Sequence, residues 1–155
     1  MSAALPAAAE AALVVVTLRV AGQLCGIPVS AVRDILSEQV ITPIPLAPPE
    51  VAGSLNLRGR IVTAIDLRRR LRLPPGQSDR TRMALVTEQK TELYALLVDQ
   101  VVEVLTLDSD QVEANPPTLS SAWAYFSHGV CRLEHALMII LDVDRLLAVT
   151  PERVS

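Results

Sequence analysis

The chain has 155 residues, a net charge of −3 at pH 7, and a composition that is 50% hydrophobic but only 3% aromatic. A chain of this length suits one compact domain, whose core must then be built from Val, Leu, Ile and Ala, and branched aliphatic residues favour β-strands. The longest apolar runs, 11–16 and 136–141, fall well short of the roughly 18 residues of a membrane-spanning helix, so direct membrane insertion is not expected. We expect a cytoplasmic protein whose two cysteines stay reduced and whose ends, 1–12 and 150–155, are flexible tails.

The first half of the chain is predicted to form strands joined by turns, with one helical turn at its end. Pro28 lacks a backbone donor, so the chain is expected to leave its sheet there, turn through Ser30 and Ala31, and resume as a strand. Gly59 supplies the backbone freedom for a tight turn, and Asp66 is expected to cap a short helical turn through Leu71. The predicted strands are 13–20, one that enters at Leu24, 32–41, 51–57 and 60–65.

The second half begins after a linker at 74–79, which contains two prolines and a glycine. A helix is predicted over 118–126, with Thr118 as its cap, and it carries most of the aromatic residues. Asp142 is expected to cap a second short turn before Arg145, as Asp66 does in the first half. The predicted strands are 82–87, 93–98, 101–107, 130–133 and 136–141.

Two pairs of segments indicate an internal duplication. Ile61–Leu71 returns as Leu137–Leu147, 76 residues later, and Gly26–Leu36 matches Ala95–Leu105 with the same spacing of aliphatic residues. An offset of this size is typical of a small barrel rather than a solenoid repeat. The sequence therefore predicts a mainly β fold of two small antiparallel five-stranded, SH3-like barrels related by duplication, with short helical segments. We expect one domain over 13–149 with lobes at roughly 13–73 and 80–149, between which strands can be exchanged.

The sequence lacks the motifs of an enzyme. It contains neither a glycine-rich phosphate loop nor a G-x-S-x-G elbow, so no catalytic residue and no cofactor are predicted. His128, Cys131 and His135 have the spacing of a small metal cluster, but no paired C-x2-C accompanies them, and a metal site is not expected. Arginines gather between Arg58 and Arg82, which raises the less favoured alternative of a small nucleic-acid-binding barrel. The acidic net charge and the absence of interleaved aromatic residues argue against nucleic acid.

One segment resembles a known family. Gly53–Val62, followed by Ala64–Arg68, is similar to the G-x-x-N-x-R-G-x-I-x-P-x-I-D-L-R signature of CheW-like domains, although this segment lacks the proline of the signature. The resemblance covers about 13–148. It implies a non-enzymatic adaptor that couples the cytoplasmic tips of methyl-accepting chemoreceptors to the regulatory domain of a CheA-type histidine kinase, as part of a larger array. The alternative is an adaptor with the same domain in a pilus-type or other chemosensory pathway.

The resemblance also implies a kinase-binding set, which maps to Val29, Val32, Asp34 and Arg58. The pattern alone does not distinguish the two valines from core positions, whereas Asp34 is polar among apolar neighbours. Arg58 lies in the N-L-R-G turn. Its guanidinium is expected either to face outward, where it can meet a carboxylate, or to hold one lobe to the other.

The receptor-binding set that the resemblance implies lies on the matching segment of the second half. It maps to a groove between the lobes that would contain Val98, Val101 and Val104. A receptor tip is helical, so an apolar groove is the expected docking mode. These three valines align with Val29, Val32 and Ile35 in the duplication.

Overall fold

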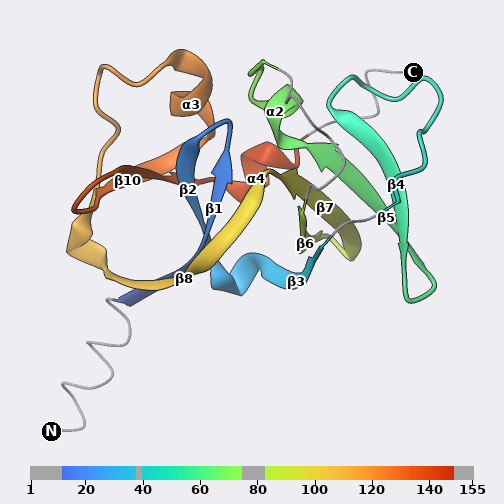
Figure 1. Cartoon of the computed structure of the whole chain (residues 1–155), viewed down its shortest axis with the longest axis horizontal. Coiled ribbons are helices and arrows are strands. Elements are labelled where there is room, and N and C mark those ends of the chain that lie inside the picture. The colour runs from blue at the N-terminus through green and yellow to red at the C-terminus, as the bar shows by residue number, and fades with distance from the viewer. Residues whose placement is uncertain (1–11, 38–39, 75–82, 149–155) are drawn as a thin grey trace, which may run out of the picture.

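The computed structural model describes residues 12–37, 40–74 and 83–148, and strands make up most of it (Figure 1). In chain order the elements are β1 Ala12–Val20, β2 Gln23–Pro28, η1 Val29–Ala31, β3 Val32–Leu36, β4 Val51–Leu57, β5 Arg60–Asp66, α2 Leu67–Arg70, β6 Met83–Gln89, β7 Glu92–Val98, β8 Gln100–Asp108, η2 Ser109–Gln111, β9 Val112–Glu113, α3 Ser121–Phe126, β10 Ser127–Arg132, β11 Leu137–Leu141 and α4 Val143–Leu146. No helix in these described ranges is long and apolar enough to cross a membrane.

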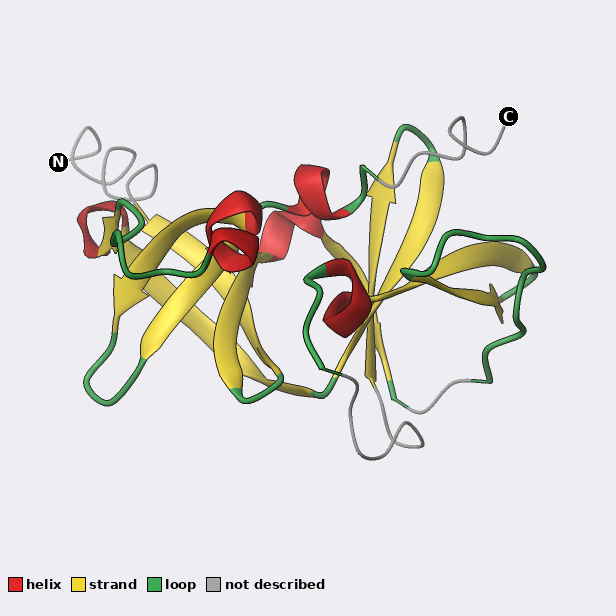
Figure 2. Ribbon diagram, turned by 90° about the horizontal axis from the view of Figure 1, so that it is seen from above, coloured by secondary structure: helices red, strands yellow, loops and turns green. Residues whose placement is uncertain are grey.

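The strands form two sheets that lie side by side (Figure 2). The strand order is β8-β1-β2-β11-β10-β9 in the first sheet and β3-β6-β7-β5-β4 in the second. We call the two units lobe A and lobe B, respectively. The mainly β fold of two small barrels that the sequence predicted is confirmed, although lobe A carries a sixth, two-residue strand, β9.

The two sheets do not follow the two halves of the sequence. The β1–β2 hairpin of the first half pairs with β8 and β11 of the second half, and the β6–β7 hairpin pairs with β3 and β5. The chain changes lobes twice, at η1 after Pro28 and at Asp99 between β7 and β8. Each barrel is completed by strands from both halves, so strands are exchanged between the expected lobes at 13–73 and 80–149, as the sequence analysis allowed. Residues 75–82, which include most of the predicted linker, lie outside the described ranges.

The duplication extends to two equivalent glycines at strand irregularities. Gly53 in β4 and Gly129 in β10 have φ of +151° and +157°, and the register shifts at both positions. A Cβ on Gly53 would lie 2.2 Å from the carbonyl oxygen of Thr42, and one on Gly129 would lie 2.9 Å from that of Glu113. Only glycine allows another backbone segment to approach this closely.

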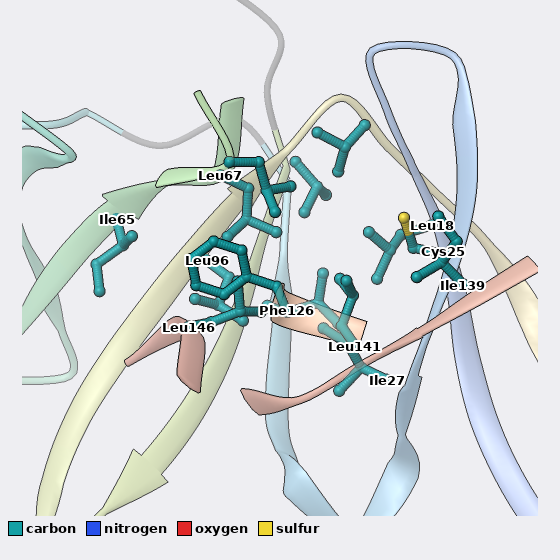
Figure 3. Close-up of a cluster of buried hydrophobic side chains, with 14 of the residues drawn as sticks. Leu18, Cys25, Ile27, Ile65, Leu67, Leu96, Phe126, Ile139, Leu141 and Leu146 are labelled. Carbon is teal, nitrogen blue, oxygen red and sulfur yellow. The ribbon is translucent and has the colours of Figure 1, made fainter. Parts of the chain in front are cut away.

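Three clusters of buried side chains hold the structure together. One cluster lies wholly in lobe A and one wholly in lobe B, whereas the largest draws on both sheets and on α2, α3 and α4 (Figure 3). Its members include Leu18, Ile27, Leu96, Phe126 and Leu141. The lobes therefore share a core, which predicts that they fold as one unit.

The local predictions hold in most places. The strands before and after Pro28 and the turn between them are confirmed, and so are the two aspartate caps. The Asp66 side chain accepts from the Arg68 amide at 3.0 Å, and the Asp142 side chain accepts from the Arg145 amide at 3.2 Å.

Three element boundaries were predicted wrongly, and one of them is the start of β10, which begins at Ser127 rather than at residue 130. The helix begins at Ser121 with Ser120 as its cap, not at Thr118, because the Ser120 hydroxyl accepts from the Trp123 amide. The third strand ends at Leu36, short of the predicted residue 41, and Thr42 forms an isolated bridge with Ser54 of β4.

Candidate functional site

The predicted residues Asp34 and Arg58 meet in the structure. Arg58 Nη1 lies 3.3 Å from Asp34 Oδ2, and the Arg58 side chain is 79% exposed. Asp34 lies on β3 and Arg58 follows β4, and these strands are the two ends of the lobe B sheet, so the ion pair joins the edges of the barrel. The Asn56 side chain accepts from the Gly59 amide and fixes the turn. Of the two roles expected for Arg58, the structure shows carboxylate pairing within lobe B rather than a link between the lobes.

The predicted valines of the kinase-binding set differ in exposure. Val29 in η1 is exposed, whereas Val32 is partly buried against the shared core. Two exposed aliphatic residues close in sequence to the ion pair were missed, namely Ile35 on β3 and Ile61 on β5. We call Val29, Asp34, Ile35, Arg58 and Ile61 the lobe B surface. No sequence signal marks Ile35, because the register of β3 shifts at Arg33 and an aliphatic residue in a predicted strand cannot be distinguished from a core position by its type.

The three predicted receptor-binding valines differ in exposure. Val98 is 1% exposed and belongs to the shared core, so its expected surface position is corrected to a packing position. Val101 is partly buried against the same core, whereas Val104 is 57% exposed on β8. The neighbouring Val102 is also exposed and was missed. We call Val102 and Val104 the lobe A surface, and it lies on the edge strand of that sheet.

One groove lies away from these valines, among the described residues of lobe A and η1. It has a volume of about 710 Å³ and is bounded by η1, η2, β9 and the start of α4. Its lining includes Pro28, Val112, Ile140 and Val143, and none of the three predicted receptor-binding valines. The three residues with metal-like spacing do not converge on one point either, since Cys131 is buried in the lobe A core while His128 and His135 are exposed.

Two arginines with a role at the lobe boundary were also missed by the sequence analysis. Arg68 forms a two-fold contact with Asp99, with Nε 3.1 Å from Oδ1 and Nη2 2.6 Å from Oδ2. The hydrogen bond to Asp99 is the main reason that the pKa of Arg68 rises above its ordinary value, so this guanidinium stays charged. Arg70 donates to backbone carbonyls of α4. Their place in an arginine-rich run gave no signal that distinguished them from exposed arginines.

These features define a class of protein. The structure is a two-lobed β scaffold with a shared core, an exposed aliphatic surface on each lobe, and no cluster of three metal-ligating side chains among the described residues. Exposed aliphatic surfaces are typical of sites that bind other proteins.

The comparisons with known proteins identify the family. The model of the CheW-like domain matches residues 14–150, and the chain therefore belongs to the CheW-like family. It is a chemotaxis coupling adaptor of that scaffold family.

Three relatives show how close the similarity is. The chain is 28% identical to the chemotaxis protein CheW of Treponema pallidum, with 86% of this chain and 81% of the relative covered. It is 28% identical to the protein PilI of Pseudomonas aeruginosa, with 90% and 79% covered. The crystal structure of the scaffolding protein TtCheW from Thermoanaerobacter tengcongensis matches with a TM-score of 0.79 at 27% identity and covers 89% of this chain and 94% of that one.

Proposed function

We propose that this chain couples the cytoplasmic tip of a methyl-accepting chemoreceptor to the regulatory domain of a CheA-type histidine kinase, without catalytic activity of its own. It acts in the cytoplasm, where the receptor tip and the kinase regulatory domain are located, and it binds no nucleic acid. The observation that carries the proposal is the placement of two exposed aliphatic surfaces on different lobes of one scaffold with a shared core.

The lobe B surface is the proposed kinase contact. Its aliphatic side chains, Val29, Ile35 and Ile61, offer apolar area, and the Arg58 guanidinium keeps donors free to meet an acceptor beside its bond to Asp34. Apolar area near an arginine is a composition typical of interface centres.

The lobe A surface is the proposed receptor contact. Val102 and Val104 are both exposed on β8, an edge strand, and the register of the β1–β8 pair shifts at Val102, which adds an extra residue to the exposed edge. The receptor tip is helical, and an aliphatic ridge of this kind can pack against the apolar face of a helix. Each contact is small, and assembly of many copies into an array supplies the remaining stability through multivalency.

A titration of the purified protein with the kinase regulatory domain, followed by calorimetry, tests the kinase contact. Arg58→Ala is expected to weaken binding by about tenfold, the effect of losing roughly 1.4 kcal/mol. Arg132→Ala is the matched control, because Arg132 is similarly exposed and pairs with Glu113 at 3.2 Å in lobe A. Equal binding by both variants would remove Arg58 from the site, and absence of saturable binding by the unchanged protein would refute the kinase contact itself.

The receptor contact is tested in the same way with a receptor cytoplasmic fragment. Val104→Asp is expected to weaken binding by about tenfold, because it places a charge in an apolar contact. Val40→Asp is the control, since Val40 is 87% exposed and lies outside both surfaces. An equal loss in both variants would show that added negative charge, not the lobe A surface, governs binding.

The second candidate function is the same coupling in another chemosensory pathway, such as a pilus-type one. The similarity to PilI favours it as an alternative. Parallel titrations with the regulatory domains of the CheA-type kinases from the same source separate the two, because the cognate kinase should bind most tightly.

A further inference from the structure

The short helix α2 carries three consecutive arginines that face different surroundings. The side chains of Arg68 and Arg70 are only 19% and 16% exposed, whereas that of Arg69 is 61% exposed. Arg69 contacts residues of lobe B, with Asp66 at 3.8 Å and the carbonyl of Pro49 at 3.3 Å. The two neighbours of Arg69 instead reach toward lobe A.

Arg68 connects to lobe A through Asp99. Asp99 lies at the crossing between β7 of lobe B and β8 of lobe A. Its carboxylate accepts hydrogen bonds from both Nε and Nη2 of Arg68. The same carboxylate accepts the Ala21 amide at 2.8 Å, and the Asp99 amide donates to the Arg19 carbonyl at 3.1 Å. Ala21 and Arg19 belong to the β1–β2 hairpin of lobe A. One carboxylate thus joins α2 of lobe B to a turn of lobe A.

Arg70 connects to lobe A through α4. Its Nε donates to the Leu146 carbonyl at 3.0 Å and its Nη2 to the Arg145 carbonyl at 2.8 Å. The guanidinium also lies 4.9 Å from the centre of the Phe126 ring, which belongs to α3, and Nη1 lies 3.7 Å from Glu50 of lobe B. A planar donor group held by two carbonyls, a ring and a carboxylate has a fixed orientation.

The second copy of the duplication lacks the two arginines that make these contacts. The positions that correspond to Arg68 and Arg70 in the second copy are Asp144 and Leu146, so α4 returns no arginine to lobe B. The shared hydrophobic core supplies most of the attraction between the lobes, but burial of apolar surface is non-directional. Bidentate hydrogen bonds have strict geometry and can select one relative orientation.

We propose that Arg68 and Arg70 are positioning residues that fix the orientation of lobe B relative to lobe A, and that receptor-to-kinase coupling requires this fixed orientation. The second clause rests on the proposed function, because it assumes that the two partners bind different lobes. A scaffold whose lobes can rock still binds each partner, but it does not hold the two in one defined geometry.

The orientation is measured directly by pulsed electron paramagnetic resonance between spin labels on Thr106→Cys in lobe A and Arg60→Cys in lobe B, both exposed strand positions. The native cysteines are buried, which keeps labelling selective. Arg68→Lys with Arg70→Lys keeps both charges but removes the planar fork, and Arg69→Lys makes the same chemical change at the arginine that stays within lobe B. We expect a broader or shifted distance distribution for the double variant and an unchanged one for Arg69→Lys. An unchanged distribution in the double variant overturns the proposal.

Coupling is then measured as receptor-dependent stimulation of kinase autophosphorylation, together with binding of each partner alone. The double variant is expected to keep both separate affinities and to lose stimulation by about tenfold, a size typical of coupling between two sites. Arg68→Lys alone, which disturbs the fold less, is expected to show a smaller loss. Full stimulation by a variant with altered lobe distances overturns the coupling role. Failure of the unchanged protein to bind either partner instead refutes the proposed function and leaves the distance result standing.

Discussion

Lobes A and B share one strand order, but the side chains in their cores and on their surfaces differ. The order β8-β1-β2-β11-β10 in lobe A corresponds to β3-β6-β7-β5-β4 in lobe B. Inside, Ala64 of lobe B occupies the position of Ile140 in lobe A, and Ile41 from the chain before β4 packs against the lobe B core. Outside, the Asp34–Arg58 pair corresponds to Glu103 and Glu134, which carry like charges. Duplication therefore preserved the barrel, while each surface diverged.

The largest expected effect concerns the two equivalent glycines. Gly53→Ala is expected to lower the free energy of unfolding by about 4 kcal/mol and Gly129→Ala by about 3 kcal/mol, because a Cβ collides with backbone at both sites and more severely at Gly53. Urea denaturation followed by circular dichroism measures both. Gly59→Ala is the control, since Gly59 has a positive φ but no atom within 4 Å of the added carbon, and only about 1 kcal/mol is expected. A smaller cost at Gly53 than at Gly59 would contradict the close approach.

The next prediction tests whether the lobes unfold together. Leu96→Ala in the shared core is expected to cost about 3 kcal/mol, and Met138→Ala in the lobe A core a similar amount. Both variants should show one transition, with coincident midpoints by circular dichroism and by fluorescence of Trp123, the only tryptophan. Separate midpoints would mean that each lobe is a folding unit of its own.

Thiol reactivity gives a second readout of the same prediction. Both cysteines lie in lobe A, and burial raises the pKa of the Cys25 thiol, so it stays protonated and unreactive in the folded protein. A disulfide reagent should therefore label Cys25 only as fast as the whole protein opens. Labelling that is faster than global unfolding would show that lobe A opens alone.

The smallest expected effect concerns the two aspartate caps. Asp66→Ala is expected to cost about 1.5 kcal/mol and Asp142→Ala about 1 kcal/mol, because each leaves a helix amide without its acceptor and Asp66 is the more buried. Thermal unfolding at equal ionic strength measures the difference. A larger loss of stability for Asp142→Ala than for Asp66→Ala would contradict the prediction, which rests on the greater burial of Asp66.

Much of the fold could be predicted because the signals are local. The turn after Pro28 and the caps at Asp66 and Asp142 depend on residues within a few positions, and the structure has them where the sequence placed them. The helix start was misplaced because Thr118 and Ser120 are both acceptable caps, and only the contact of Ser120 with the Trp123 amide separates them. A carboxylate partner for Arg58 was one of two expectations, and only the closure of the lobe B barrel brought Asp34 to that position.

The sequence by itself determined that this chain is a duplicated, mainly β protein of the CheW-like family, since strand spacing, turn residues and the N-L-R-G turn are written in adjacent residues. Only the tertiary structure decided which strands share a lobe and which aliphatic residues reach the surface. Val29 and Val98 are the same residue at aligned positions, yet Val29 is 42% exposed and Val98 is 1% exposed. Exposure depends on segments far apart in the chain, so local pattern does not encode it. The roles of Arg68 and Arg70 have the same origin, because their partners in lobe A are distant in sequence.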